Sequence, residues 1–101
     1  MKNEKIKEMS VAIVGLGVIG AAFAESFKNI GIKTVYGIDI DEMTIRKAED
    51  KGIITKGYLE TKEPLEKSDL VIITLYPNFY NFANDRYLYT KNKWQIFSGK
   101  G

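Results

Sequence analysis

Cysteine and histidine are both absent from this sequence of 101 residues. Without cysteine the chain has no disulfide framework, thiol nucleophile or cysteine-based zinc site, and its composition fits a reducing environment such as the cytoplasm. Without histidine it lacks the commonest general acid or base and the commonest metal ligand. We therefore expect a cytoplasmic protein with neither a catalytic residue nor a metal site in these residues.

Long apolar runs and excess charge of one sign are also missing. The longest apolar stretch, at residues 11–24, is interrupted by glycines and is too short to cross a membrane. Residues 1–9 are rich in lysine and glutamate and lack the apolar segment of a secretory signal. The 15 Lys and Arg and 13 Asp and Glu give a net charge of +2, and the lysines are scattered. The sequence therefore favours neither nucleic acid nor a membrane as a partner.

The hydrophobic pattern predicts strands and helices in alternation, and the length fits one domain. Strands are expected at residues 11–14, 34–38, 53–55, 70–75 and 94–97. Helices are expected at residues 18–30 and 41–51, with a short helical turn at 63–66. The runs at 11–14 and 70–75 are continuously apolar, which is typical of strands buried on both faces. The expected fold is α/β, a Rossmann-like doubly wound parallel sheet in a single, partial domain.

The two expected helices carry local signals of their packing and their ends. The apolar residues of the first helix that recur at helical spacing, and that we expect on its buried face, are Ile19, Phe23, Phe27 and Ile30. Asp41 is the expected N-cap of the second helix, and Gly52 is expected to end it.

One glycine-rich segment carries the clearest functional signal. Its six residues are Gly15, Leu16, Gly17, Val18, Ile19 and Gly20. The G-x-G-x-x-G spacing alone is weak evidence, because glycines fall at these distances by chance. Here, however, the motif follows a buried strand and opens a helix, and an acidic residue ends the next strand about 20 residues further on. In this context the segment predicts a dinucleotide-binding loop to which all six residues contribute.

Each glycine of this loop has its own physical reason. Gly15 permits the tight turn out of the strand, and Gly17 leaves room for a pyrophosphate to approach the backbone. Gly20 lets the helix pack closely against the strand. The free N–H groups around Val18 and Ile19 are expected to face the diphosphate, favoured also by the helix dipole.

Asp39 is the expected anchor of the adenosine ribose. Its carboxylate can accept hydrogen bonds from the ribose hydroxyls and would repel a 2′-phosphate, so NAD is favoured over NADP as the cofactor. The following residue, Ile40, has no charge for a phosphate. Asp41 competes for the same role, although its position favours capping. For Arg46 and Lys47, on the next helix, we favour a solvated face over a phosphate clamp.

Two features near the carboxyl end of the fourth expected strand leave alternatives open. Leu75 and Tyr76 precede Pro77, where an open α/β sheet presents ligands, and they could line the path to the nicotinamide. Equally, this segment could simply end the strand. Beyond it lies an aromatic group for which we favour the cover of a small core over base stacking: Tyr80, Phe82, Tyr87 and Tyr89.

Residues 11–77 resemble the prephenate dehydrogenase family of tyrosine biosynthesis. The matching segments are VAIVGLGVIGAAFAESFK, VYGIDIDEMTIRKAEDKGII and KEPLEKSDLVIITLYP. Many nicotinamide dehydrogenases share the first segment, whereas the second and third narrow the resemblance. The family oxidises prephenate or arogenate with NAD(P), passing a hydride to the nicotinamide while the ring loses carbon dioxide. The resemblance gives the cofactor-binding role to Gly15, Gly17, Gly20 and Asp39.

The sequence also departs from this family. Ala21 and Ala22 stand where the family often has Gly-Ser, and the catalytic histidine that follows the family's fifth strand has no counterpart here. We expect residues 1–101 to form one dinucleotide-binding domain, family-like over 11–77 and atypical over 78–101, without the family's catalytic and dimerisation domain. Such a domain is expected to be inactive alone.

Two other readings are open, and both keep the dinucleotide as partner. The chain could be a non-enzymatic domain that senses NAD, or a fragment of another Rossmann reductase. If the sheet ends at a fifth strand, one edge and one core face are left for a second copy of the chain or for a missing domain.

Overall fold

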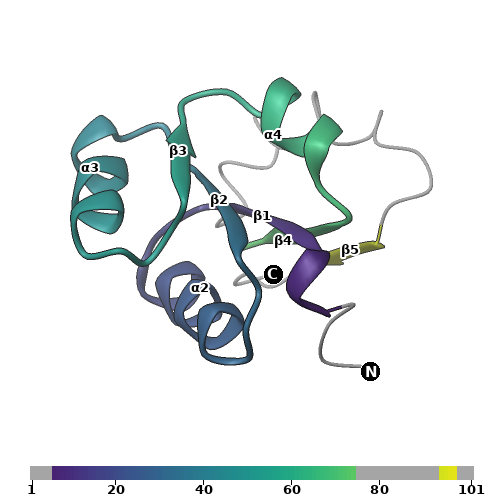
Figure 1. The fold of residues 1–101 in the computed structure, drawn as a ribbon. Coiled ribbons are helices and arrows are strands. Elements are labelled where there is room, and N and C mark those ends of the chain that lie inside the picture. Colours follow the sequence, from purple (N-terminus) through teal and green to yellow (C-terminus); the bar gives the residue numbers. More distant parts are fainter. Residues whose placement is uncertain (1–5, 75–93, 98–101) are drawn as a thin grey trace.

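A computed structural model describes residues 6–74 and the backbone of 94–97. Within these ranges five parallel strands form one sheet in the order β3-β2-β1-β4-β5 (Figure 1). The strands are β1 (Ser10–Val14), β2 (Thr34–Ile38), β3 (Lys56–Tyr58), β4 (Leu70–Ile73) and β5 (Trp94–Phe97). The helices are α2 (Val18–Asn29), α3 (Glu42–Asp50) and α4 (Lys62–Lys67). The α/β fold expected from the sequence is confirmed, including the strand at 94–97.

Strand β1 lies at the centre of the sheet and sets its topology. Along its length Ser10–Val14 pairs with Thr34–Ile38 of β2, and Val11–Val14 pairs with Leu70–Ile73 of β4. The chain therefore moves outward from β1 to β3 on one side and from β4 to β5 on the other. The strand order reverses between β1 and β4, and in open α/β sheets ligands bind beyond the carboxyl ends of the strands at such a point.

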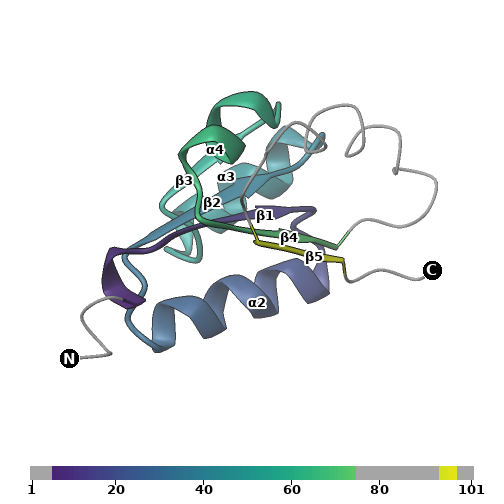
Figure 2. The same cartoon turned by 90° about the vertical axis from the view of Figure 1, so that its right-hand side faces the viewer.

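The sheet buries a separate apolar layer on each face, because successive side chains of a strand point to opposite sides. Val11 and Ile13 of β1 belong to the layer that packs against α2 and α3. Ala12 and Val14 belong to the layer that contains Leu65 of α4. Figure 2 shows α2 and α4 on opposite sides of the sheet. All four of these β1 residues are fully buried, as the continuous apolar run predicted.

The third strand lies later in the chain than the sequence indicated. The prediction of a strand at 53–55 is wrong, because β3 spans Lys56–Tyr58 and pairs with Tyr36–Ile38. Ile54 is buried in the loop before the strand, where its side chain packs over Gly37. The apolar pair that suggested a strand is therefore a loop segment that fills the core beneath α3.

Helix α2 packs through its small residues. Gly20 and Ala24 are its buried positions, while Phe23 and Phe27 are partly buried and stack with their ring centroids 6.2 Å apart. The expected burial of Ile19 and Ile30 is wrong, since these side chains are 50% and 56% exposed. The buried face of α2 is therefore narrower than the apolar stripe that the sequence predicted.

The ends of the helices follow the local signals. Asp41 is the N-cap of α3, and its carboxylate accepts hydrogen bonds from the Met43 N–H at 3.2 Å and from the Thr44 hydroxyl at 2.8 Å. Gly52 follows this helix with φ +72°, a conformation that suits glycine. The expected turn at 63–66 is present within α4, with Pro64 in its first turn.

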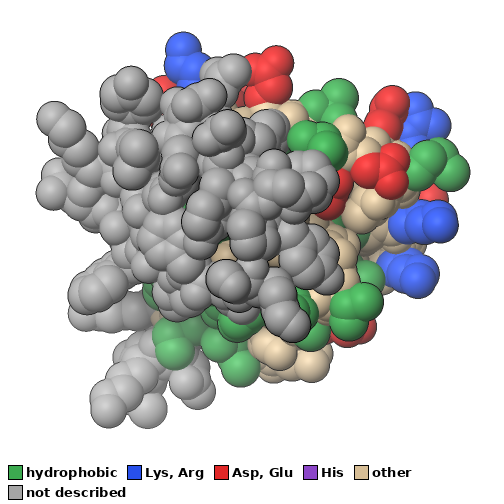
Figure 3. Space-filling view, turned by 180° about the vertical axis from the view of Figure 1, so that it is seen from behind, with side chains coloured by type: hydrophobic (Ala, Val, Ile, Leu, Met, Phe, Trp, Pro, Cys, Tyr) green, Lys and Arg blue, Asp and Glu red, His purple; other side chains and the backbone are tan. Residues whose placement is uncertain are grey.

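Several predictions fall on residues outside the described ranges. These are the end of the fourth strand and the segment of Leu75, Tyr76 and Pro77, together with Tyr80, Phe82, Tyr87 and Tyr89. In the described part of the chain no helix is long and apolar enough to cross a membrane. Figure 3 shows acidic and basic side chains interspersed over the described surface of one face.

Candidate functional site

The glycine loop begins with a turn that only glycine adopts readily. Gly15 follows β1 directly and has φ +99°, where a side chain would be strained. Its N–H donates to the carbonyl oxygen of Ile38 at 2.7 Å, so the loop leaves β1 beside the carboxyl end of β2. The tight turn that the sequence predicted at this position is present.

Gly20 allows the first turn of α2 to lie against the loop itself. A Cβ atom at Gly20 would stand 1.9 Å from the carbonyl oxygen of Gly15 and 3.0 Å from Thr74 Oγ1. Real Cβ atoms are never this close to a backbone oxygen, so any side chain would force the helix away. The close packing predicted for Gly20 is thus found, and its nearest neighbour is the loop carbonyl rather than the strand.

Gly17 has open space where a side chain would lie, unlike Gly20. It is the residue that precedes α2, and a Cβ built on it meets no atom within 4 Å. It offers no side chain to cap the helix, and the first turn of α2 contains no acidic residue. The N–H groups at the start of a helix lack partners within the helix and are weakly positive. This end of α2 can therefore accept an anionic group close to the backbone.

The Asp39 carboxylate lies between the glycine loop and the start of α3. Its Oδ2 accepts a hydrogen bond from the Leu16 N–H at 2.9 Å, and its Oδ1 accepts one from the Asp41 N–H at 2.9 Å. Asp39 is only half-buried. Each carboxylate oxygen can accept about two hydrogen bonds, so both retain capacity for a ligand hydroxyl. The structure thus brings Asp39 and the glycine loop together, as the sequence predicted.

The charged residues that follow Asp39 have other contacts. Asp41 directs its carboxylate to the first turn of α3, in agreement with the capping role. The Arg46 guanidinium pairs with the Glu42 carboxylate at 3.1 Å on an exposed face of the helix. Lys47 is exposed as well. This arrangement agrees with a solvated helix face at these positions.

Exposed apolar side chains follow the carboxyl ends of three strands, and we call this group the carboxyl rim. Its members follow the carboxyl ends of β1, β2 and β3 and are at least half exposed: Val18, Ile19, Ile40, Met43 and Leu59. Large apolar side chains gathered at the ligand-binding edge of an α/β sheet mark a surface for an apolar group. Sequence reasoning missed Met43 and Leu59, although their positions just beyond Asp39 and β3 were the available signal.

Thr74 is a further residue that the sequence did not reveal. It follows β4, and its hydroxyl donates to the Gly15 carbonyl oxygen at 2.7 Å, with the Val14 carbonyl oxygen further away at 3.3 Å. No local pattern marks this threonine, because the contact joins residues 59 positions apart.

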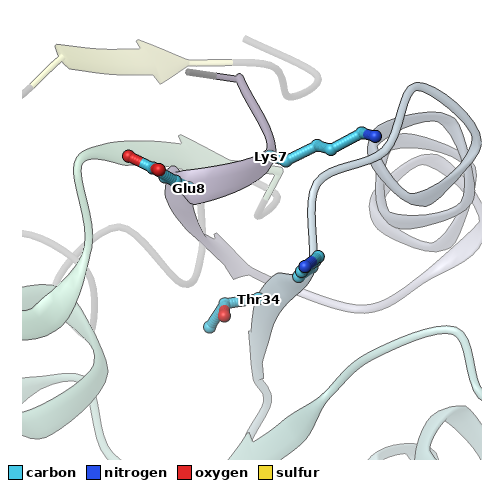
Figure 4. Close-up of a pocket in the computed structure, with 4 residues that line it drawn as sticks. Lys7, Glu8 and Thr34 are labelled. Carbon is cyan, nitrogen blue, oxygen red and sulfur yellow. The ribbon is translucent and has the colours of Figure 1, made fainter. Parts of the chain in front are cut away.

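One hollow lined by described residues lies away from this loop. It measures about 650 Å³ and is lined, within the described residues, by Lys7, Glu8, Lys33 and Thr34, near the amino ends of β1 and β2. Figure 4 shows the Lys7 and Glu8 side chains pointing in opposite directions. Because these side chains do not converge on one point, the hollow lacks the arrangement of a binding site. Within the described ranges no group of three acidic, histidine or cysteine side chains could hold a metal ion.

Comparison with known families identifies the chain from its sequence. Residues 5–89 match the family described as acetohydroxy acid isomeroreductase, NADPH-binding domain. The chain belongs to this family.

Two curated relatives match a similar stretch. The ketol-acid reductoisomerase (NADP(+)) of Sulfolobus acidocaldarius is 34% identical over 70 residues, which are 69% of this chain and 20% of that protein. The NAD-dependent malic enzyme 1 of Bacillus subtilis is 35% identical over 69 residues, 68% of this chain and 15% of that protein.

A solved structure agrees with the same assignment at the level of the fold. The prephenate dehydrogenase of Aquifex aeolicus, in complex with hydroxyphenyl propionate and NAD+, superposes with a TM-score of 0.78 at 29% identity. The match covers 90% of this chain and 33% of that chain. This domain therefore spans about a third of that enzyme. The chain is therefore an NAD(P)-binding domain with a Rossmann fold.

Proposed function

We propose that this domain selects NAD and belongs to a dehydrogenase of the prephenate dehydrogenase type. The selection of NAD rests on the Asp39 carboxylate. The N–H groups of Leu16 and Asp41 hold this carboxylate beside the glycine loop. A ribose placed there offers hydroxyl donors to its free lone pairs. A 2′-phosphate would instead bring negative charge against a carboxylate that cannot turn away without losing both hydrogen bonds.

The remaining parts of the site fit the other parts of a dinucleotide. The diphosphate lies at the start of α2, where Gly17 leaves the backbone open. The adenine packs on the carboxyl rim beside Asp39, formed there by Ile40 and Met43. A bound nicotinamide supplies hydride transfer, and the residues of this chain bind and orient the cofactor. The sequence contains no histidine, the commonest proton acceptor in such a site.

The substrate class rests on sequence and fold together. The segments KEPLEKSDLVIITLYP and VYGIDIDEMTIRKAEDKGII carry the resemblance to prephenate dehydrogenases, and the Aquifex enzyme supports it through its fold. A second candidate is a ketol-acid reductoisomerase that uses NADP, supported by the family match and by the Sulfolobus relative. The two candidates differ in the cofactor that they select.

Calorimetric titration of the 101-residue chain with NAD and with NADP separates them. We expect NAD to bind roughly tenfold more tightly or better, and Asp39→Asn to remove most of this preference. The matched control is Asp69→Asn, because the Asp69 carboxylate also accepts a backbone N–H, that of Ser10 at 3.0 Å, but at the amino ends of β1 and β4. Tighter binding of NADP by the unaltered chain would exclude the selection of NAD and favour the reductoisomerase.

A further inference from the structure

One peptide group of the glycine loop is held at both of its polar ends. This is the peptide that joins Gly15 to Leu16. Its carbonyl oxygen accepts the Thr74 hydroxyl at 2.7 Å, and its N–H donates to Asp39 Oδ2 at 2.9 Å. Thr74 follows β4 and Asp39 follows β2, and these strands pair with β1 on its two sides. The orientation of this peptide is therefore fixed from both neighbours of the strand that carries it.

Thr74 is itself well placed to hold this carbonyl. Its N–H donates to the Val14 carbonyl oxygen at 2.8 Å, so its backbone continues the hydrogen bonding of β4 with β1. A threonine side chain is branched at Cβ and has restricted rotation. Its hydroxyl has a single proton to donate, and the Gly15 oxygen is the nearer of its two acceptors.

The packing around this contact restricts the orientation of the Gly15 carbonyl group. The Gly15 oxygen lies over Gly20, where a Cβ would come within 1.9 Å of it, and the same Cβ would stand 3.0 Å from Thr74 Oγ1. Loss of the hydroxyl would allow the peptide to rotate. Because the chain continues from this peptide directly to Gly17 and the first N–H groups of α2, a rotation there changes the direction of the donors that face the anion site.

We propose that Thr74 is a positioning residue for dinucleotide binding. Its hydroxyl orients the Gly15–Leu16 peptide and, through it, the N–H groups at the start of α2 that hold the diphosphate. The inference rests on the proposed binding of a dinucleotide and adds a determinant of affinity on β4, the strand on the opposite side of β1 from Asp39. Thr74 acts through the loop and touches no cofactor atom.

The test compares Thr74→Val with Thr74→Ser in titrations of the full chain with NAD and with ADP-ribose. Valine keeps the shape and removes the donor, and we expect it to weaken both ligands by roughly fivefold. Serine keeps the donor and should restore the affinity to within about twofold of the unaltered chain. Equal losses for the two ligands are expected, because ADP-ribose retains the diphosphate and lacks the nicotinamide.

Thr55→Val is the matched control for stability. The Thr55 hydroxyl also joins backbone groups, since it donates to the Lys33 carbonyl at 3.0 Å and accepts the Val35 N–H at 2.9 Å, but it lies at the amino end of the sheet. We expect this variant to lower the melting temperature and to leave both affinities unchanged. A loss of affinity that Thr55→Val shares, or that serine fails to restore, overturns the positioning role.

The outcomes also separate this inference from the proposed function. If the unaltered chain binds neither NAD, NADP nor ADP-ribose, the proposed function fails. If it binds them and Thr74→Val binds equally well, only the role of Thr74 fails. A loss confined to NAD would place the effect at the nicotinamide and likewise overturn the proposal. Should Thr74→Val not fold, Thr74→Ser against Thr74→Cys gives the same comparison, because a thiol is a much weaker donor than a hydroxyl.

Discussion

Asp39 and Thr74 bind opposite ends of the same peptide group, one through its N–H and the other through its carbonyl oxygen. They reach it from sequence distances of 23 and 59 residues. The two contacts are not independent, because a peptide released at one end can rotate and so weaken the bond at the other. The conformation of the glycine loop after β1 thus depends on residues that follow β2 and β4.

A double-mutant cycle measures this dependence in the absence of any ligand. We expect the losses of unfolding free energy in Asp39→Asn and Thr74→Val to sum to more than the loss in the double variant, by about 0.5 kcal/mol or more. Denaturant unfolding of the four proteins gives the coupling. The same cycle with Asp69→Asn in place of Asp39→Asn should be additive within roughly 0.5 kcal/mol, because Asp69 acts at the amino ends of β1 and β4, away from the loop. Additive losses for Asp39 and Thr74 would show that the peptide does not couple them.

Two glycines of the loop should respond in opposite ways to the same added methyl group. Gly20→Ala drives a Cβ into the Gly15 carbonyl, and we expect a loss of about 3 kcal/mol of stability or failure to fold. Gly17→Ala meets open space and has φ −71°, so its cost should stay below about 1 kcal/mol. It should nevertheless impair NAD binding, because the methyl occupies the approach of the diphosphate. Thermal unfolding and calorimetry of both variants test this, and normal NAD binding by Gly17→Ala would contradict the placement.

Thr61 offers a stabilising substitution. Among the described residues its hydroxyl is buried without a hydrogen-bond partner, and the side chain does not cap α4. Burial of an unpaired hydroxyl is unfavourable, so Thr61→Val should raise the free energy of unfolding by about 1 kcal/mol. Thr55→Val is the contrasting control and should lower it by a similar amount. A destabilised Thr61→Val variant in denaturant unfolding would mean that the hydroxyl has a partner in solution.

Glu49 protects the edge of the sheet. Strand β3 lies at one end of the strand order, and its Gly57 N–H donates to Glu49 Oε2 of α3 at 2.8 Å. Exposed edge N–H groups promote pairing with other chains. We expect Glu49→Ala to lose about 1 kcal/mol and to associate more at high concentration, as measured by sedimentation. Glu49→Gln keeps an oxygen acceptor and should associate less than the alanine variant.

The Glu63–Lys67 pair should contribute to stability at neutral pH and lose that contribution in acid. The hydrogen bond and charge of Lys67, 2.9 Å away, lower the pKa of Glu63 below its ordinary value of 4.5. A lowered pKa stabilises the fold above the ordinary value and ceases to do so as the pH falls through the lowered one. In a plot of melting temperature against pH, Glu63→Gln should therefore slightly reduce the fall at acid pH, and only at low salt. Glu60→Gln is the control, and an identical reduction in both variants would count against the pair.

Local chemistry made the glycine loop predictable from sequence. Gly15, Gly17 and Gly20 follow an apolar strand at fixed spacing. The backbone turn requires Gly15 and a close contact within the loop requires Gly20, whereas Gly17 leaves space open beside the backbone. Asp39 was found because an acidic residue at the end of the next strand is part of the same pattern. The N-cap at Asp41 and the stop at Gly52 are likewise signals of short range.

The features that the sequence did not reveal depend on which segments meet in space. Ile54 looks like a strand residue because it is apolar, and only the packing over Gly37 shows that it fills a loop. Ile19 looked buried because its spacing is helical, but it lies in the first turn of α2 and is 50% exposed. Thr74 has no signal at all, since its role depends on a partner 59 residues away.

The glycine loop begins directly after the paired ends of three strands, and this has a consequence for the lifetime of the protein in a cell. Val14 ends β1 level with Ile38 of β2 and Ile73 of β4, so the loop exists only when all three strands are paired. A ligand that binds this loop therefore binds only forms in which β1, β2 and β4 are paired. At a concentration about a hundredfold above its dissociation constant, such a ligand adds about 2.7 kcal/mol to the free energy of unfolding. The supply of dinucleotide would then govern how often the chain opens to proteases, and thereby its abundance.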